Sequence, residues 1–226
     1  MITYFSIKIK MYIRTVKEYD QCDSIFIYQP DFLTINEQEV FFNYLNEMDD
    51  FKINMNYKES KIIRQQKWYQ TENRYFCSEW KHRYDRWESH NYDEYIFNLQ
   101  QKIQKYVNKC LIKTVKLNSC LINKYRDGKD NIRPHRDTEK SFGTTPTIIG
   151  LSIGAERDIQ FERIIGSNGI NFKKDNNNKH LNFKQRLKSG SLFIMAGNSQ
   201  INFTHEIPKC DSKEVRYSLT FRELID

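Results

Sequence analysis

Residues 123–137, NKYRDGKDNIRPHRD, carry the strongest chemical signal in this chain of 226 residues. The stretch ends with His135 and Asp137, an imidazole and a carboxylate two positions apart. In an extended segment, residues i and i+2 project from the same side of the backbone, so both side chains can reach one point in space. The pair therefore predicts two ligands of a metal site on a β-rich scaffold, with a third ligand to come from elsewhere in the chain.

The sequence around this stretch has the pattern of short strands. Runs rich in β-branched and aromatic residues are separated by Gly, Asp and Asn, which is typical of strands joined by turns. They cover residues 117–125, 145–154, 157–163, 190–197 and 214–223. Residues 164–189 are polar and predict a loop. This order predicts a mostly antiparallel double sheet of the jelly-roll type.

The N-terminal part predicts helices. Thr34 and Glu37 fit a capping box at the start of a helix over about 35–48, and apolar residues at helical spacing predict a second helix over about 92–109. Residues 1–23 predict an extension or a strand, and residues 24–226 a single domain. The expected fold class is α+β and mostly β, with a double-stranded β-helix (jelly-roll) core and N-terminal helices packed on one sheet.

Composition limits the classes of function. The net charge of +7 favours a polyanionic partner, although many soluble proteins are equally basic. Five cysteines without a CxxC pair argue against a disulfide framework and predict a reducing compartment, nucleus or cytoplasm. No apolar run approaches 18 residues, so no membrane span is expected. The abundance of Ile, Lys, Asn and Tyr suggests an AT-rich, viral origin, and a monomer is expected.

The last predicted strand carries a second chemical feature. Period-two alternation places Tyr217, Leu219 and Phe221 on one face. The opposite face holds Arg216, Ser218, Thr220 and Arg222. Two interpretations remain open: an edge strand with solvent-facing arginines, or arginines that point into the barrel and bind a carboxylate ligand.

A third metal ligand can come from His205, which lies between the predicted strands 190–197 and 214–223. The other histidines, His82, His90 and His180, lie in charged or polar segments and are expected to be solvated. Two neutral imidazoles and one carboxylate on one face of a metal suit Fe(II) and oxygen chemistry.

Residues 62–80, IIRQQKWYQTENRYFCSEW, mix aromatic and basic side chains. Rings can stack on a splayed base while cations hold the phosphate backbone, which points to Arg64, Lys67 and Arg74 as backbone contacts. The alternative is a hairpin that packs its aromatic residues into the core. The lysines of the second helix, at positions 102, 105 and 109, are open to the same two interpretations, a solvated face or a phosphate contact.

Together these motifs resemble the AlkB family of Fe(II)- and 2-oxoglutarate-dependent dioxygenases, in particular its eukaryotic DNA-repair branch. The resemblance covers roughly residues 25–224. It rests on the NxYxDG…HxD segment at 123–137, on residues 149–158 and 190–192, on His205, and on the two arginines of the last strand. Residues 62–80 resemble the nucleotide-recognition lid of that branch, but lack its Pro before Arg64 and its Gly after Tyr69.

The resemblance implies a role for each matched residue. The implied Fe(II) ligands are His135, Asp137 and His205. The implied 2-oxoglutarate contacts are Asn123, Tyr125, Arg216 and Arg222. The implied contacts to the target base are Trp68, Tyr69, Phe76 and Glu139. The resemblance also implies a residue before the lid that fills the gap left by a flipped base. Met55 and Tyr57 are the candidates, although the sequence match there is poor.

The implied activity is oxidative demethylation of N-alkylated bases of the 1-methyladenine or 3-methylcytosine type in single- or double-stranded DNA or RNA. It would use Fe(II), O2 and 2-oxoglutarate and would release succinate, CO2 and formaldehyde, in repair of alkylated nucleic acid. Two alternatives remain. One is a 2-oxoglutarate oxygenase that acts on a protein or small molecule, and the other is a catalytically silent nucleic-acid-binding module on the same scaffold.

Overall fold

A computed structural model describes residues 11–17, 23–55, 61–71, 89–111, 114–137, 139–168 and 171–225. Within them the first strands are β1 (Tyr12–Val16), β2 (Ser24–Gln29), β3 (Lys52–Met55), β4 (Lys61–Gln70), β5 (Ser119–Tyr125), β6 (Ile132–His135) and β7 (Ile148–Gly154). The later strands are β8 (Arg157–Asn168), β9 (Asn171–Lys174), β10 (Phe183–Leu187), β11 (Leu192–Gly197), β12 (Phe203–Ile207) and β13 (Arg216–Arg222). The helices are α1 (Ile35–Glu47), α2 (Glu94–Cys110), α3 (Glu139–Phe142), the 3-10 helix η3 (Lys179–Leu181) and α4 (Ser199–Asn202).

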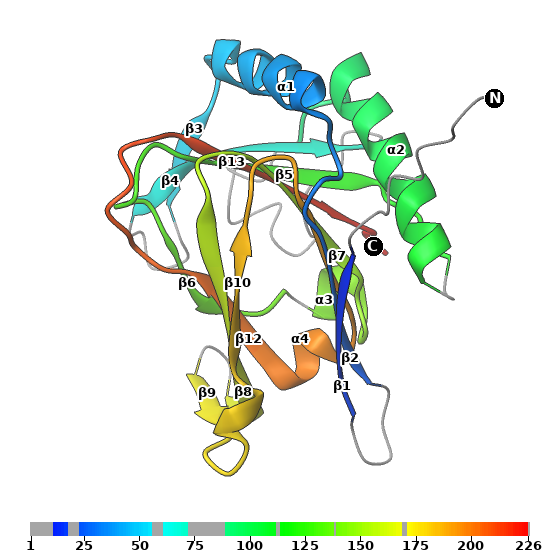
Figure 1. Cartoon of the computed structure of the whole chain (residues 1–226), viewed down its shortest axis with the longest axis vertical. Helices are drawn as coiled ribbons and strands as arrows, with labels where there is room; N and C mark the ends of the chain where they lie inside the picture. Colours follow the sequence, from blue (N-terminus) through cyan, green and yellow to red (C-terminus); the bar gives the residue numbers. More distant parts are fainter. Residues whose placement is uncertain are drawn as a thin grey trace, which may run out of the picture.

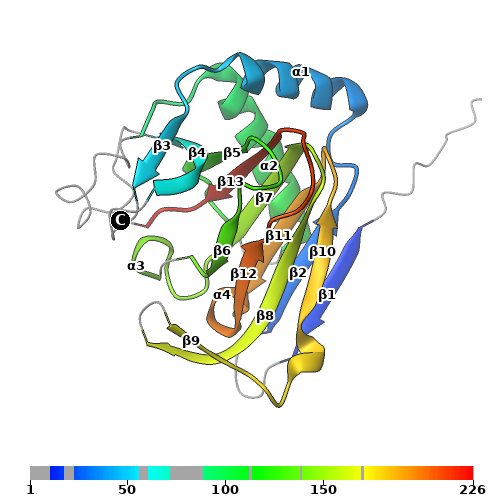
Figure 2. The ribbon, with the colours of Figure 1, turned by 90° about the vertical axis from the view of Figure 1, so that its left-hand side faces the viewer.

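The strands form two sheets that face each other (Figure 2). The larger sheet has the order β1-β2-β11-β7-β13-β5-β4-β3, and the smaller has the order β10-β8-β12-β6, with β9 paired to β8. The strand pairs among the described residues are antiparallel, and neighbouring strands are often far apart in sequence, as β13 is from both β5 and β7. This arrangement confirms the predicted double-sheet fold class.

The two long helices cover the outer face of the larger sheet (Figures 1 and 2). The capping box at α1 is present, because the Thr34 hydroxyl accepts from the Glu37 backbone N–H and the Glu37 carboxylate accepts from the Thr34 N–H. Ile96, Leu99 and Ile103 of α2 pack with the sheet residues in one core cluster, so hydrophobic burial holds the helix layer to the sheet. The predicted positions of both helices are confirmed.

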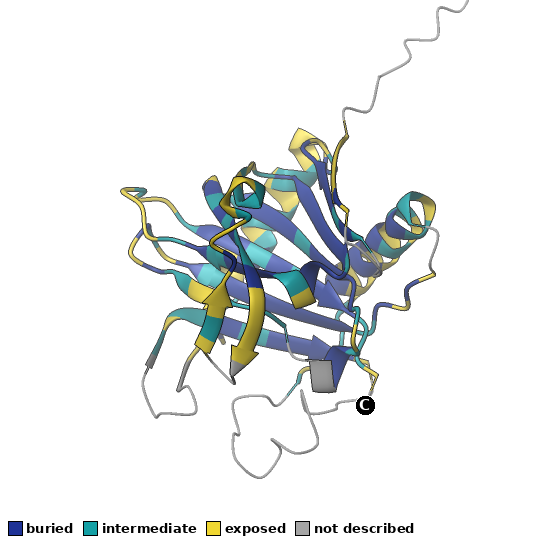
Figure 3. Ribbon diagram, turned by 90° about the horizontal axis from the view of Figure 1, so that it is seen from below, coloured by how far each residue is buried: buried dark blue, intermediate teal, exposed yellow. Residues whose placement is uncertain are grey.

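The inner face of the larger sheet forms a second core with the smaller sheet. Aromatic rings from both sheets meet there, with Phe26 of β2 within 4.9 Å of the ring of Phe161 in β8 and 5.3 Å of the ring of Phe203 in β12. Buried residues therefore occupy both faces of the larger sheet, as the dark blue strands of Figure 3 show.

The predicted loop over 164–189 is wrong. Strand β8 continues to Asn168, β9 forms a hairpin with it, and β10 is the edge strand of the smaller sheet. Only Leu187 of β10 is buried, and the other β10 side chains are polar or partly exposed, so an edge position left the segment without a strong apolar signal. The N-terminal region contains the edge strand β1, paired with β2. No helix among the described residues is long and apolar enough to cross a membrane.

Candidate active site between the two sheets

Strand β13 presents its arginine face to the interior. Tyr217, Leu219 and Phe221 lie in the core beneath the helices, whereas Arg216 and Arg222 line a cavity between the two sheets. The arginines therefore point into the barrel and not to solvent, the orientation that the second interpretation of this strand requires. Guanidinium groups in such a position are suited to anionic ligands.

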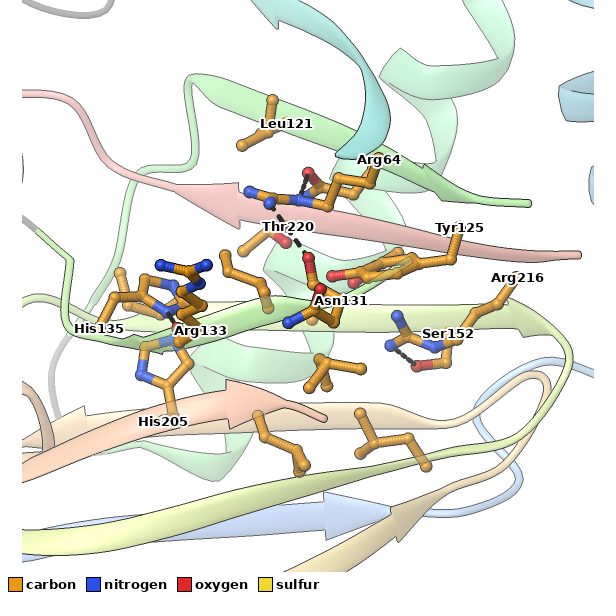
Figure 4. A pocket seen from close by; sticks show the side chains of 18 of the residues that line it. Arg64, Leu121, Tyr125, Asn131, Arg133, His135, Ser152, His205, Arg216 and Thr220 are labelled. Atoms are coloured by element: carbon orange, nitrogen blue, oxygen red, sulfur yellow. Dashed lines mark hydrogen bonds between the residues drawn. The ribbon is translucent and has the colours of Figure 1, made fainter. Parts of the chain in front are cut away.

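The cavity has a volume of about 740 Å³. Strands of both sheets contribute to it, with His135 and His205 at one end and Arg216 beside Tyr125 toward the other (Figure 4). Apolar walls come from Ile148, Ile159, Leu187, Phe193 and Met195. A large, mostly apolar cavity with a few convergent polar groups is the usual form of a small-molecule site.

The structure brings His135 and His205 together. They are directly paired in the β6–β12 register, and their ring centroids lie 4.2 Å apart. The Arg133 carbonyl can only accept, so at 2.9 Å it receives the proton of His135 Nδ1 and leaves Nε2 as an acceptor. Burial lowers the pKa of His135. Burial and the neighbouring His135 lower the pKa of His205 to about 3. Both imidazoles are therefore neutral at pH 7, the form that binds metals.

Asp137 lies next to this pair and is held by Arg222. Arg222 Nε donates to Oδ2 at 2.9 Å and Nη2 to Oδ1 at 3.2 Å, and the Asp137 backbone N–H donates to Gln200 Oε1 at 3.0 Å. Burial alone would raise the pKa of Asp137, but the Arg222 guanidinium and the imidazoles hold it below its usual range. The carboxylate is thus ionised.

The donor set of two neutral imidazoles and one carboxylate is chemically suited to Fe(II). Among the described residues, however, no three His, Cys, Asp or Glu side chains form a ready metal-binding group. Each Asp137 oxygen accepts one hydrogen bond from Arg222, and the second lone pair of each oxygen remains for a metal.

Arg216 has the character of an anion-binding group. It is 1% exposed, Nη2 donates to Ser152 Oγ at 2.9 Å, and Nε and Nη1 have no hydrogen-bond partner among the described residues. A buried guanidinium with unused donors is costly unless a ligand fills the space. Arg222 differs, because two of its nitrogens are already bonded to Asp137. Of the two arginines that the resemblance implies as 2-oxoglutarate contacts, Arg216 is thus the one whose Nε and Nη1 have no partner among the described residues.

Asn123 and Tyr125, the other predicted 2-oxoglutarate contacts, line the same cavity. Two guanidinium groups lie near the Tyr125 ring, with Cζ of Arg216 at 5.1 Å and Cζ of Arg157 at 5.5 Å from its centroid. Asn123 Oδ1 accepts from Arg64 Nε at 2.7 Å and from Gln66 Nε2 at 3.0 Å. The predicted co-substrate residues therefore all line one cavity, with Arg216 beside Tyr125 and Arg222 beside Asp137.

Several of the predicted nucleic-acid contacts do not face the cavity. Tyr69 belongs to the hydrophobic core beneath the helices, with Tyr92 at 6.1 Å between ring centroids, so the core interpretation is correct for this residue. Lys67 forms an ion pair with Asp50 at 2.6 Å and is 11% exposed. Period-two alternation explains both corrections, since Lys67 and Tyr69 are two positions apart on β4 and share the face that is turned to the helix layer. Trp68 is buried, at 2% exposed.

Arg64, predicted as a backbone contact, lies inside the cavity instead. Arg74, Phe76, Tyr57 and His82 lie outside the described residues, as do the side chains of Glu139 and Met55. His90 and His180 are exposed, as expected.

Several cavity residues had no signal in the sequence. They are Gln66, Asn131, Arg133, Ser152 and Lys209. Gln66 could have been found, because it is two positions from Arg64 on one strand and thus shares its face. The same argument applies to Arg133, which is two positions from His135 on β6. Asn131, Ser152 and Lys209 carried no such signal.

Comparisons with known proteins agree with this geometry. The model of the 2OG-Fe(II) oxygenase superfamily matches residues 26–222, so the chain belongs to that superfamily. It is 34% identical to the DNA oxidative demethylase ALKBH2 of Arabidopsis thaliana over 118 residues, 47% of this chain and 38% of the relative. It is 36% identical to the alpha-ketoglutarate-dependent dioxygenase alkB homolog 3 of Homo sapiens over 110 residues, 46% of this chain and 36% of the relative. The match thus spans less than half the length of these relatives.

Solved structures share the fold. The structure of OsALKBH1 has a TM-score of 0.59 at 13% identity, covering 91% of this chain and 99% of the other. A prolyl-4-hydroxylase of Pseudomonas putida has a TM-score of 0.53 at 15% identity, covering 88% of this chain and 92% of the other. The double-sheet fold is therefore shared with OsALKBH1 and with a protein named as a prolyl-4-hydroxylase.

Proposed function

We propose that the protein is an AlkB-type demethylase that removes N-methyl groups from bases of DNA or RNA. The observation that carries the proposal is the cavity itself: two neutral, paired imidazoles and a carboxylate at one end, and a buried guanidinium with unused donors toward the other. This donor set and anion site are what an enzyme needs to hold Fe(II) and a small dicarboxylate together.

In this proposal His135, His205 and Asp137 hold Fe(II). When bound, Fe(II) with O2 and 2-oxoglutarate supplies an oxidant that hydroxylates an N-methyl group, with release of succinate and CO2; the N-hydroxymethyl product then loses formaldehyde. Arg222 keeps Asp137 ionised and oriented. The metal contacts of His135 and His205 rest on their neutral forms, which burial maintains.

Arg216 binds the far carboxylate of 2-oxoglutarate, because its Nε and Nη1 have no other partner among the described residues. Asn123 and Tyr125 add hydrogen bonds beside it. Arg222 is already bonded to Asp137, so its role is to orient that ligand. The apolar walls formed by Ile148, Phe193 and Met195 exclude water around the reacting atoms.

A nucleic-acid target is supported by the similarity to ALKBH2 and alkB homolog 3 over about half of the chain and by the net charge of +7. A methylated base must leave the helical stack, or lie in a single strand, before its methyl group can enter a cavity of this kind.

The test is turnover of defined oligonucleotides. Single- and double-stranded DNA and RNA carrying 1-methyladenine or 3-methylcytosine are incubated with the protein, Fe(II), 2-oxoglutarate and O2, and both formaldehyde and succinate are measured. We expect formaldehyde from at least one substrate, and no formaldehyde or succinate from His135→Ala. His180→Ala, the same change at an exposed histidine, should retain activity.

The outcomes separate the alternatives. Succinate release without demethylation of any oligonucleotide would indicate an oxygenase with a protein or small-molecule substrate. Oligonucleotide binding without succinate would indicate a silent binding module. Activity that survives His135→Ala would contradict the metal assignment.

A further inference from the structure

One amide in the cavity has its orientation fixed by its neighbours. Asn123 Oδ1 accepts two hydrogen bonds, from Arg64 Nε and from Gln66 Nε2, both on β4. An arginine nitrogen can only donate, so the Asn123 atom that faces Arg64 must be the oxygen. Gln66 meets the same oxygen and must therefore offer its NH2 group.

This arrangement leaves Asn123 Nδ2 for a ligand. None of the described residues accepts a hydrogen bond from Nδ2, and Asn123 lines the cavity. Asn123 is directly opposite Ser218 in the β13–β5 register, and Ser218 is directly opposite Ser152 in the β13–β7 register. Ser152 Oγ accepts the Arg216 guanidinium. Asn123 Nδ2 and the Arg216 guanidinium are therefore hydrogen-bond donors in the same region of the cavity.

We infer that Arg64 and Gln66 are positioning residues for the co-substrate. They hold the Asn123 amide with its NH2 group toward the cavity, where it donates to an oxygen of the bound dicarboxylate. If the amide turned over, its oxygen would face the carboxylate and repel it. The inference rests on the proposed use of 2-oxoglutarate at this site.

The consequence is a link between β4 and the co-substrate. Strand β4 belongs to the segment 62–80 that resembles a nucleotide-recognition lid. A displacement of Arg64 or Gln66 would release the Asn123 amide and weaken 2-oxoglutarate binding. Coupling between two ligands is reciprocal, so bound 2-oxoglutarate would in turn favour the β4 position that holds the amide.

The experiment measures 2-oxoglutarate binding by calorimetry on the 226-residue chain loaded with Mn(II), without turnover. Gln66→Met removes one donor at nearly constant size, and we expect about 3- to 10-fold weaker binding, the effect of losing one hydrogen bond. Gln66→Glu replaces the donor with an acceptor that repels Oδ1 and should weaken binding more than Gln66→Met. Gln65→Glu is the matched control, because Gln65 is on the opposite face of β4 and pairs with Lys124.

A double-mutant cycle tests whether Gln66 acts through Asn123. Asn123→Leu should itself weaken 2-oxoglutarate binding, and Gln66→Met should weaken it less than twofold further in that background. If the two residues acted independently, the losses in binding free energy of the two single variants would add in the double variant. Unfolding temperatures recorded on the same samples identify any variant that is merely misfolded. Arg64→Met provides a second variant that should behave as Gln66→Met does.

Each result has one meaning. If the wild type fails to bind 2-oxoglutarate, the proposed function is wrong. If the wild type binds and the folded variants Gln66→Met, Gln66→Glu and Arg64→Met bind equally well, the positioning role is wrong while the proposed function stands. Additive losses in the double mutant would likewise overturn it, since they would indicate a direct contact of Gln66 with the ligand.

Discussion

Asp137 and Arg222 form a buried ion pair at the centre of the candidate site, with side chains that are 9% and 7% exposed. Removal of one partner from a buried pair leaves the other charge uncompensated, which typically costs about 3–5 kcal/mol. The pair therefore ties the stability of the apoprotein to a residue that we propose as a metal ligand.

Arg222→Met should lower the free energy of unfolding by about 3 kcal/mol and weaken Mn(II) binding, because Asp137 loses its partner. Urea denaturation and metal titration measure the two effects. Arg186→Met is the matched control: Arg186 pairs with Glu156 and Asp158 at the surface, with a side chain 52% exposed, and exposed pairs contribute about 0–1 kcal/mol. Equal losses in the two variants would contradict the special role of the buried pair.

His205 predicts a pH dependence of stability in the metal-free protein. Its pKa is about 3 when folded and about 6.5 when unfolded, so between these values the unfolded chain binds more protons. Stability should therefore fall as the pH is lowered from about 6.5 toward 3. Denaturation at pH 7 and pH 5 in the presence of a chelator measures the change. His205→Gln, which does not titrate, should show a smaller loss over this interval, and an unchanged loss would exclude His205 as a cause.

At the scale of elements, the turn between β5 and β6 is held against the segment between β12 and β13. Gly128 N–H donates to the Ser212 carbonyl at 2.7 Å, and the Cys210 N–H donates to the Gly128 carbonyl at 2.9 Å. A Cβ at Gly128 would lie 2.0 Å from the Cys210 carbonyl oxygen. The turn thus needs glycine for close approach of two backbones, and this contact precedes Arg216 at the start of β13.

Gly128→Ala should separate the two segments, destabilise the protein by about 1–3 kcal/mol as overpacking does, and weaken 2-oxoglutarate binding through Arg216. Thermal unfolding and calorimetry test these effects. Lys129→Ala, at an exposed position in the same turn, should change the stability by less than about 0.5 kcal/mol. Wild-type stability of Gly128→Ala would show that the turn can relax at no cost.

At the scale of the whole molecule, the candidate ligands come from both sheets. His135 and His205 lie in the smaller sheet and Arg216 in the larger sheet, so metal and co-substrate together would bridge the two layers. A ligand that binds only the folded state adds stability that rises with its concentration, by about 2.7 kcal/mol at 100 times its dissociation constant.

We therefore expect Mn(II) and 2-oxoglutarate together to raise the unfolding temperature more than either alone. Removal of the metal with a chelator should reverse the effect, and Arg216→Met should abolish the part due to 2-oxoglutarate. Thermal shift measurements on wild type and Arg216→Met, with and without each ligand, test both expectations. An equal response of both proteins to 2-oxoglutarate would contradict the assignment of its carboxylate to Arg216.

The sequence by itself determined which residues share a strand face. Period-two alternation assigned Arg216 and Arg222 to one face of β13, and the HxD spacing placed His135 beside Asp137. Local signals such as the Thr34–Glu37 capping box were equally reliable, because they depend on residues three positions apart.

Only the tertiary structure decided which face points into the cavity. Both faces of the larger sheet are buried, one under α1 and α2 and the other against the smaller sheet. The hydrophobic pattern of β4 therefore could not show that the face with Tyr69 packs in the core and that the face with Arg64 lines the cavity. The pairing of Asp137 with Arg222, and of Arg64 and Gln66 with Asn123, joins residues 57 to 85 positions apart. The contacts of Arg64 and Gln66 with Asn123 depend on the pairing of β4 with β5 within one sheet, and the contact of Asp137 with Arg222 depends on how the two sheets close on each other. No local pattern in the sequence encodes either arrangement.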